Sequence, residues 1–159
     1  MTESTEALRR LTADLPPGRL MGRGHAAGDF LEAYEWEVLE ESPGVLRVAC
    51  HLPEHTKNPR GQLFGGFTPT YVDLVSLYTV RAGRPRDEMG WMATTNMRID
   101  YFEPVMGPRF HLEGRLEKSR GRTHFVAARF YVGPAFDQLA VFSLTTMREI
   151  KVSSPLGDG

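Results

Sequence analysis

Residues 65–80 read GGFTPTYVDLVSLYTV, and this stretch decides the fold. Its apolar side chains are spread around nearly the whole circumference of a helix and leave almost no charged face. A helix that is apolar on almost all sides is buried in a protein core. The sequence therefore predicts one buried helix from the Gly65–Gly66 pair to about residue 80, with Asp73 as its one acidic side chain.

Strand-like segments precede and follow this helix. They are rich in Val, Phe, Thr and Tyr and are separated by turn residues. Two precede the helix and four follow it, at residues 33–41, 44–52, 93–102, 109–118, 122–132 and 136–150. A tight turn is expected at residues 119–121. Strands that follow one another pair in an antiparallel sheet, and the helix must bury its apolar stripe against that sheet, so the predicted class is α+β.

The composition limits the kind of protein. The chain has 159 residues, enough for one domain, and its net charge of −1 offers no basic face for nucleic acid. A single cysteine, Cys50, excludes an internal disulfide and indicates a reducing compartment. The N-terminus has no apolar signal region and residues 63–80 are too mixed for a membrane span, so we expect a cytoplasmic protein.

We expect three segments in the chain. Residues 1–32 would form a short helix at 3–14 and a linker rich in Gly and Pro. Residues 33–152 would form the domain that carries the function. Residues 153–159 would be a frayed tail.

Asp73 is the first candidate for chemistry. A buried and unpaired carboxylate is costly or has a raised pKa, so an acid kept in an apolar helix indicates a functional site. The alternative is that Asp73 lies on a thin exposed edge or pairs with an arginine. The first N–H groups of a helix have no partner within it, so Gly65 and Gly66 could hold an oxyanion. The alternative for the two glycines is plain turn chemistry.

The spacing of these groups favours a shared site. Gly65 and Asp73 are eight residues apart, which is about 12 Å along a helix. A base and an oxyanion donor that act on one carbonyl must both lie within a few ångströms of it. Two antiparallel helices at a two-fold interface could supply both groups. A symmetric dimer follows, if both groups act on one substrate.

The run from Asn58 to Gly66, followed by Asp73, resembles the hot-dog thioesterase family of the phenylacetate-pathway (PaaI-like) type. The family pattern is an asparagine, a His-Gly-Gly at the helix start, and an acid eight residues after the first glycine; the spacings here are seven and eight. ATTNMRIDYFEPVMG at 93–107 resembles the family's long strand after the helix. LEKSRGRTHFVAARFYV at 116–132 resembles its hairpin. The resemblance covers roughly residues 33–150.

The resemblance implies a curved antiparallel sheet wrapped around one long central helix. It also implies dimers with sites at their interface, commonly paired into tetramers, and acyl-CoA hydrolysis with no metal or cofactor beyond the CoA of the substrate. Asp73 would be general base or nucleophile, and the Gly65 N–H would polarise the thioester carbonyl. Asn58 would orient the carbonyl or the attacking water. Thr94 would hold that water, and Thr95 is one position away.

Phe64 departs from the family pattern, which has histidine there. A phenyl ring donates no hydrogen bond, so Phe64 either shapes the acyl pocket or indicates weak activity or an unusual substrate. Gly66 would let the substrate approach the backbone closely. A group of basic residues is expected to bind the CoA phosphates, with a solvated turn as the alternative. Its members flank the predicted hairpin and are Lys118, Arg120 and Arg122.

Other functions and sites remain open. An enoyl-thioester hydratase or dehydratase usually needs a histidine, and residues 61–80 contain none. A non-catalytic acyl-CoA sensor is the alternative from another class, and Phe64 favours it. Cys50 is interpreted as a small buried side chain and His124 as an ordinary face residue. A metal site at His51, Glu54 and His55 is not expected, because Pro53 interrupts any helix there.

Overall fold

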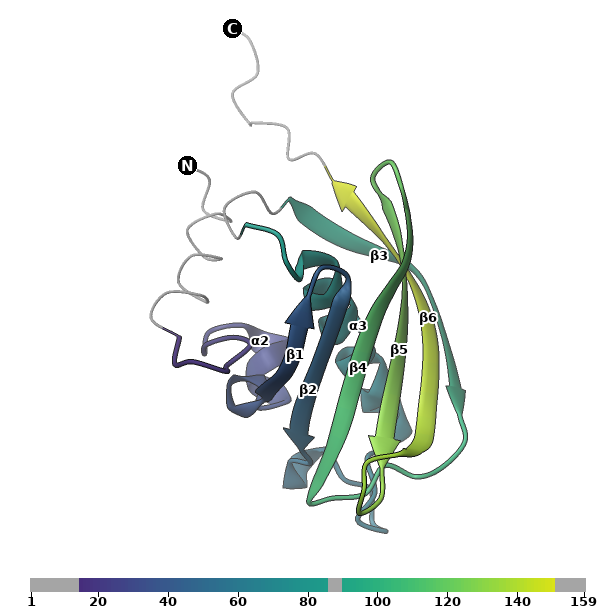
Figure 1. Ribbon diagram of the computed structural model, residues 1–159. Coiled ribbons are helices and arrows are strands. Elements are labelled where there is room, and N and C mark those ends of the chain that lie inside the picture. The colour runs from purple at the N-terminus through teal and green to yellow at the C-terminus, as the bar shows by residue number, and fades with distance from the viewer. Residues whose placement is uncertain (1–14, 86–89, 151–159) are drawn as a thin grey trace, which may run out of the picture.

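The computed structural model describes residues 15–85 and 90–150, which form a six-stranded antiparallel sheet curved around one long helix (Figure 1). The helices are α2 (Ala26–Phe30) and α3 (Thr68–Arg81), with 3₁₀ helices at Ala33–Glu35, Glu54–Thr56 and Gly65–Phe67. The strands are β1 (Glu37–Ser42), β2 (Val45–His51), β3 (Trp91–Tyr101), β4 (Arg109–Arg120), β5 (Thr123–Val132) and β6 (Gln138–Ile150). Their order in the sheet is β1-β2-β4-β5-β6-β3. The α+β prediction is confirmed.

The first strand begins later than the sequence suggests. Residues 33–35 form a 3₁₀ helix instead, closed by a hydrogen bond of 3.1 Å from the Trp36 N–H to the Ala33 carbonyl. Residues three apart share one face of a 3₁₀ helix, and Ala33 and Trp36 are both 0% exposed. The prediction of a strand from residue 33 is therefore wrong, because this turn places both side chains in the core.

Two other elements differ from the sequence prediction. The helix α2 lies within the stretch expected to be a linker, and the His25 ring caps it by accepting from the Gly28 N–H at 3.0 Å. The β4–β5 turn falls at Gly121 and Arg122, since Arg120 pairs with Thr123 and Gly121 has φ +58°. The turn was expected at residues 119–121, so Gly121 is confirmed as a turn residue, while Ser119 and Arg120 belong to β4. The helix expected at residues 3–14 and the tail at 153–159 lie outside the described residues.

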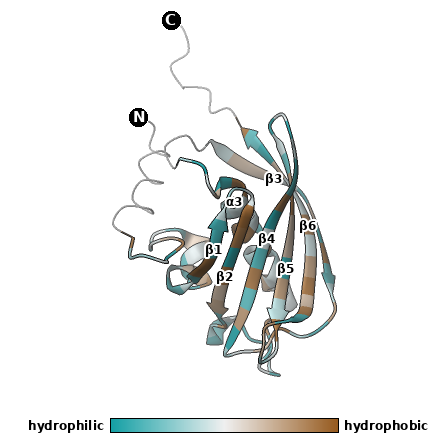
Figure 2. Ribbon diagram, viewed as in Figure 1, coloured by the Kyte–Doolittle hydropathy of each residue, from teal (hydrophilic) through white to brown (hydrophobic). Residues whose placement is uncertain are grey.

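The core forms between α3 and the concave face of the sheet. Its centre is a run of aromatic rings in which Tyr71 of α3 stacks on Trp36 at 5.7 Å and meets Phe110 edge-on at 5.4 Å. Phe110 in turn stacks on Phe130 at 5.8 Å. Bands of apolar and polar residues follow one another along β4, as Figure 2 shows, because successive side chains point to opposite faces.

Gly114 sets how closely α3 approaches β4. A Cβ at this position would lie 1.9 Å from Thr79 Oγ1 on the helix, so only glycine fits. Thr79 is fully buried, and its hydroxyl donates a hydrogen bond to the Val75 carbonyl at 2.7 Å. The helix can therefore bury this hydroxyl directly against the strand.

Candidate active site

Asp73 is exposed on α3, while its neighbours Val72 and Leu74 are buried. The expectation that this acid is buried in the chain is therefore wrong, and the alternative of an exposed edge is confirmed. The helix buries its other faces against the sheet. The carboxylate faces β3, the strand at one edge of the sheet.

A backbone irregularity in β3 aims one threonine at Asp73. The register against β6 passes from Thr94–Met147 to Asn96–Thr146, so Thr95 is the extra residue of a bulge. The Thr94 hydroxyl donates a hydrogen bond to Asp73 Oδ1. The Thr95 hydroxyl donates instead to the Thr146 carbonyl at 3.2 Å. The structure thus places Thr94 in this site and directs Thr95 away from it.

The glycine pair begins the helix as a 3₁₀ turn, Gly65–Phe67, that leads into α3. Gly65 is exposed, and no group in residues 15–85 or 90–150 accepts a hydrogen bond from its N–H. Its carbonyl accepts a hydrogen bond of 2.9 Å from the hydroxyl of Tyr101 at the end of β3. Tyr101 therefore fixes the orientation of the peptide at the helix start.

Phe64 lies over this turn and is half exposed. A Cβ at Gly66 would come within 2.7 Å of the Phe64 ring, which explains the second glycine by packing. The same ring meets Phe67 edge-on at 5.3 Å. The phenyl group thus covers the helix start with apolar surface at the position of the family's histidine.

Asn58 organises the loop before the helix. Its side-chain oxygen accepts hydrogen bonds from the N–H groups of Arg60 at 2.9 Å and Gln62 at 3.1 Å. This is the local turn that asparagine commonly forms. The side-chain amide has one long contact, 3.4 Å to the Gln62 amide oxygen. A role for Asn58 toward substrate remains a prediction beside this structural role.

The predicted phosphate-binding residues lie on the β4–β5 hairpin. Lys118, Arg120 and Arg122 are all exposed there. The register connects the hairpin to the acid site, since Ser119 pairs with His124, and both His124 and Thr94 pair with Met147. Three strand spacings separate Ser119 from Thr94, which is about 14 Å.

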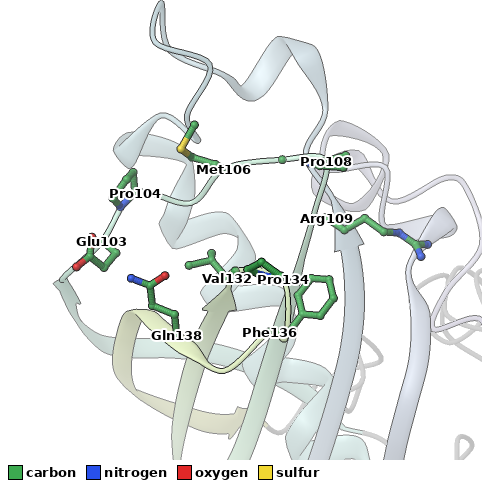
Figure 3. A pocket seen from close by; sticks show the side chains of 11 residues that line it. Glu103, Pro104, Met106, Pro108, Arg109, Val132, Pro134, Phe136 and Gln138 are labelled. Atoms are coloured by element: carbon green, nitrogen blue, oxygen red, sulfur yellow. The ribbon is translucent and has the colours of Figure 1, made fainter.

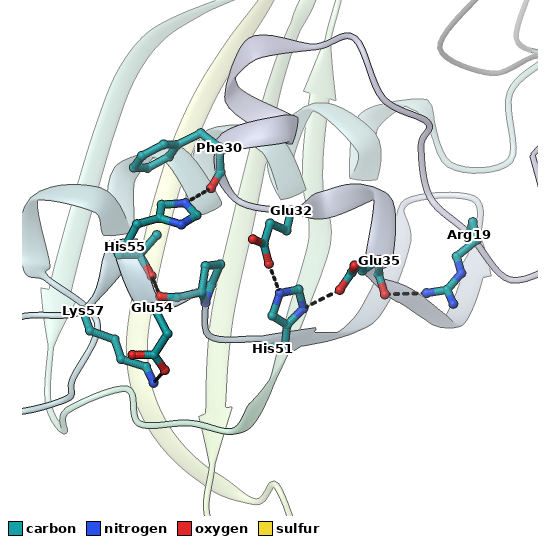
Figure 4. Close-up of polar contacts among 10 residues, drawn as sticks. Arg19, Phe30, Glu32, Glu35, His51, Glu54, His55 and Lys57 are labelled. Atoms are coloured by element: carbon teal, nitrogen blue, oxygen red, sulfur yellow. Dashed lines mark hydrogen bonds and ion pairs between the residues drawn. The ribbon is translucent and has the colours of Figure 1, made fainter.

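Other sequence candidates have structural explanations. Cys50 is fully buried, and burial raises the pKa of its thiol despite the opposing charge of Arg109. The interpretation of Cys50 as a small buried side chain is confirmed. His51 contacts Glu32 through Nε2 and lies 3.7 Å from Glu35 through Nδ1 (Figure 4).

Three potential metal ligands converge at this histidine. Oxygen and nitrogen atoms of Glu32, Glu35 and His51 lie within 4.8 Å of one another. This set shares only His51 with the one weighed from the sequence. Both ring nitrogens already face a carboxylate, so these contacts account for the cluster, and we assign no metal to it.

A cavity of about 600 Å³ opens at the other end of the sheet, between the β3–β4 loop and the β5–β6 turn (Figure 3). Met106, Arg109, Val132, Phe136 and Gln138 are among its lining residues. None of the residues predicted for the active site lines it. Sequence reasoning also missed Tyr101 as a site residue.

Part of the sequence matches a known family model. Residues 60–134 match the family model described as Thioesterase superfamily. No curated protein matches the sequence significantly. The matched segment contains the helix start, Asp73 and Thr94.

Solved structures share the fold at low sequence identity. A phenylacetic acid degradation-related protein from Ralstonia eutropha is 18% identical, with 88% of this chain and 96% of that chain covered and a TM-score of 0.69. Zebrafish thioesterase superfamily member 2 is 21% identical, with coverages of 92% and 96% and a TM-score of 0.66. A Streptococcus mutans protein bound to acetyl CoA is 18% identical, with coverages of 73% and 89% and a TM-score of 0.61.

The structural matches confirm the predicted hot-dog arrangement of one helix wrapped by an antiparallel sheet. In the described residues no helix is long and apolar enough to cross a membrane. The family match over residues 60–134 and the shared hot-dog fold support a thioester hydrolase similar to the thioesterase superfamily.

Proposed function

We propose that the protein hydrolyses acyl-CoA thioesters to the free acid and CoA, with Asp73 as general base or nucleophile. The observation that carries this proposal is the contact between the Thr94 hydroxyl and Asp73 Oδ1 on an exposed edge of the molecule. A carboxylate that accepts a hydrogen bond from a hydroxyl through one oxygen keeps its second oxygen available. That oxygen can take a proton from a water or attack a carbonyl carbon. The threonine can hold an attacking water beside it.

The Gly65 N–H is the proposed oxyanion donor. It begins a helix, is exposed, and has no acceptor in the described part of the chain. The positive end of the helix dipole strengthens such a donor for a carbonyl oxygen that gains negative charge. The Tyr101 hydroxyl holds the Gly65 carbonyl and so keeps the turn in place. Asn58 would orient the carbonyl or the water from the preceding loop.

Each site is proposed to use two copies of the chain. Asp73 and Gly65 are separated by about 12 Å of helix, too far for both to act on one carbonyl. The strand β3 is an edge of the sheet, with eleven residues and an unpaired side in the described chain. Such an edge is a template for pairing with another chain. A two-fold axis at β3 would bring the two α3 helices together in antiparallel orientation, and dimers would pair into tetramers.

Acyl-CoA is the proposed thioester because of the basic hairpin. The Streptococcus mutans structure with the same fold holds acetyl CoA. Lys118 and Arg120 flank Ser119, which lies about 14 Å across the sheet from Thr94, a separation comparable to the pantetheine arm of CoA, and Arg122 follows in the turn. These three residues would bind the phosphates of CoA. Phe64 and Gly66 would border the acyl group at the helix start.

The test is thiol release by an Asp73→Asn variant. An amide can neither take a proton nor attack a thioester, so turnover should fall by about 10²–10⁴-fold with the fold intact. Asp100→Asn is the matched control, because Asp100 is an acid on β3 that pairs with Arg98 at 3.2 Å instead. Near-normal turnover by Asp73→Asn would remove Asp73 from the mechanism.

A further inference from the structure

A chain of hydrogen bonds runs through the hairpin end of the sheet. Ser119 Oγ lies 2.8 Å from Nδ1 of His124, and Nε2 of the same ring lies 3.1 Å from Glu149 Oε1. Arg84, from the loop after α3, donates to the same carboxylate oxygen at 2.8 Å. Figure 1 shows that β6 ends beside the β4–β5 hairpin. His124 is therefore a bonded and buried residue, 2% exposed, rather than an ordinary face residue.

The register of the sheet holds this arrangement in place. Ser119 and His124 are direct partners across β4 and β5, so their side chains lie on the same face. The Glu149 N–H donates to the Arg122 carbonyl at 2.8 Å, which fixes the end of β6 against the hairpin. The three side chains thus meet through strand pairing.

The charge on Glu149 determines where the protons lie. Burial opposes its ionisation, but hydrogen bonds from Arg84 and His124 outweigh burial and hold the pKa of Glu149 below its usual value. An ionised carboxylate only accepts, so whenever the His124 ring carries a single proton, that proton lies on Nε2. Nδ1 then accepts the hydroxyl proton of Ser119. The hydroxyl oxygen is left with its lone pairs free.

We propose that Ser119 is a nucleophilic serine, with His124 as its base and Glu149 as the group that orients the base, and that it accepts acyl groups from small carboxyl esters. A hydroxyl, a base within hydrogen-bond reach and a third group that orients the base are the signature of an activated nucleophile. The accessibility fits this role. Ser119 is exposed, whereas its base is buried and shielded from water.

The transfer balances without any other reactant. Oγ of Ser119 bonds to the ester carbonyl carbon, and the bond from that carbon to the leaving oxygen breaks. The hydroxyl proton passes to Nδ1 of His124 and then to the departing alkoxide. The products are an acyl-serine and an alcohol, with no change in oxidation state.

The nucleophile is separate from the proposed thioesterase carboxylate, since about 14 Å of sheet divides Ser119 from Thr94, while its neighbours Lys118 and Arg120 belong to the proposed CoA phosphate site. A cavity of about 430 Å³ shares Arg84 with the hydrogen-bond chain. Val80, Ala82 and Leu116 also line this cavity, whereas Ser119, His124 and Glu149 do not.

The experiment uses p-nitrophenyl acetate with the Asp73→Asn protein, so that the thioesterase carboxylate cannot react. We expect a burst of p-nitrophenolate and, by peptide mass spectrometry, one acetyl group on Ser119. Ser119→Ala in the same background should abolish both. His124→Gln should slow acetylation by about 10²-fold, the usual contribution of a general base. Glu149→Gln should slow it in the same direction.

Ser42 is the internal control, because its hydroxyl makes no hydrogen bond within the described part of the chain. Acetylation of Ser119 no faster than that of Ser42 would overturn the proposal. Equal rates for Ser119 in folded and urea-unfolded protein would do the same, and this comparison needs no variant. Ser119→Ala alone should keep thiol release from acyl-CoA, so failure of this proposal is distinct from failure of the thioesterase proposal.

Discussion

Thr94 reaches Asp73 because β3 carries a bulge at Thr95. Without the extra residue, the two hydroxyls would keep the simple alternation of a strand, and the register to β6 would continue unbroken. With it, Thr94 faces the carboxylate and Thr95 faces the Thr146 carbonyl. The sequence alone left both threonines as candidates, since it does not show which of two adjacent threonines is the extra residue of a bulge.

The hydroxyl of Tyr101 can be tested by removing it alone. Tyr101→Phe removes the hydrogen bond to the Gly65 carbonyl, which frees the turn that presents the proposed oxyanion donor. We expect a several-fold lower kcat for thiol release and a loss of about 0.5–1.5 kcal/mol in unfolding free energy. Steady-state kinetics and urea unfolding measure the two effects.

The matched control is Tyr131→Phe, a phenol-to-phenyl change on β5. Tyr131 lies near Arg47, with the guanidinium 5.9 Å from the ring centre, and the phenyl ring keeps that contact. Its kinetics should match wild type. If Tyr101→Phe were as active as this control, the hydroxyl would have no part in placing the helix start.

At the scale of elements, α3 and β4 fit together through one missing side chain. Gly114 lies under the fully buried Thr79, and the helix rests on the strand at that point. The sequence indicated a helix on a sheet, but it did not show which strand the helix touches. Contacts of this kind depend on the strand order, in which β3 pairs with β6 and lies apart from β2 and β4, its neighbours in sequence.

Gly114→Ala should therefore destabilise the protein. The new methyl would lie 1.9 Å from Thr79 Oγ1, and overpacking of this kind costs about 1–3 kcal/mol. The loss should be smaller in a Thr79→Ala background, where the blocking hydroxyl is gone. Gly90→Ala is the control, because a Cβ there meets no atom within 4 Å. Equal unfolding free energies for the two alanine variants would refute the close approach.

The sequence predicted the type and order of the helices and strands better than it predicted their first and last residues. The helix was predicted from its apolar pattern, and the six strands from their content of Val, Phe, Thr and Tyr and from the turn residues between them. The errors fell where tertiary contacts decide. Residues 33–35 form a 3₁₀ turn, and Trp36 directly after it stacks on Tyr71 in the core. Asp73 is exposed because the sheet does not cover that side of α3. An apolar pattern in a helix does not show which part of the helix surface the sheet leaves uncovered.

At the scale of the whole molecule, one edge of the sheet is exposed and carries large side chains. Trp91 and Tyr101, at the two ends of β3, are each about half exposed. A second copy paired along this edge would cover them and complete two active sites. The sequence predicted such a dimer from spacing alone, and the edge position of β3 supplies a physical route to it.

Mixing two inactive variants tests the shared site. Asp73→Asn keeps the Gly65 N–H, and Gly65→Pro keeps the carboxylate. Proline is compatible with the first turn of a helix, and Phe64 before it is already extended at φ −64° and ψ 125°. Half of the randomly exchanged dimers would contain one intact site, so about a quarter of wild-type activity should return. No recovery after exchange is confirmed by mass spectrometry would contradict sites built from two chains.

The most direct measurement is thiol release from a panel of short, medium, long-chain and aryl acyl-CoAs by the wild-type protein. The proposed chemistry requires release of free CoA with multiple turnovers on at least one acyl class, and the preferred class would define what Phe64 and its neighbours accept. Tight binding of the same thioesters with no thiol released from any of them would contradict hydrolysis and favour an acyl-CoA sensor.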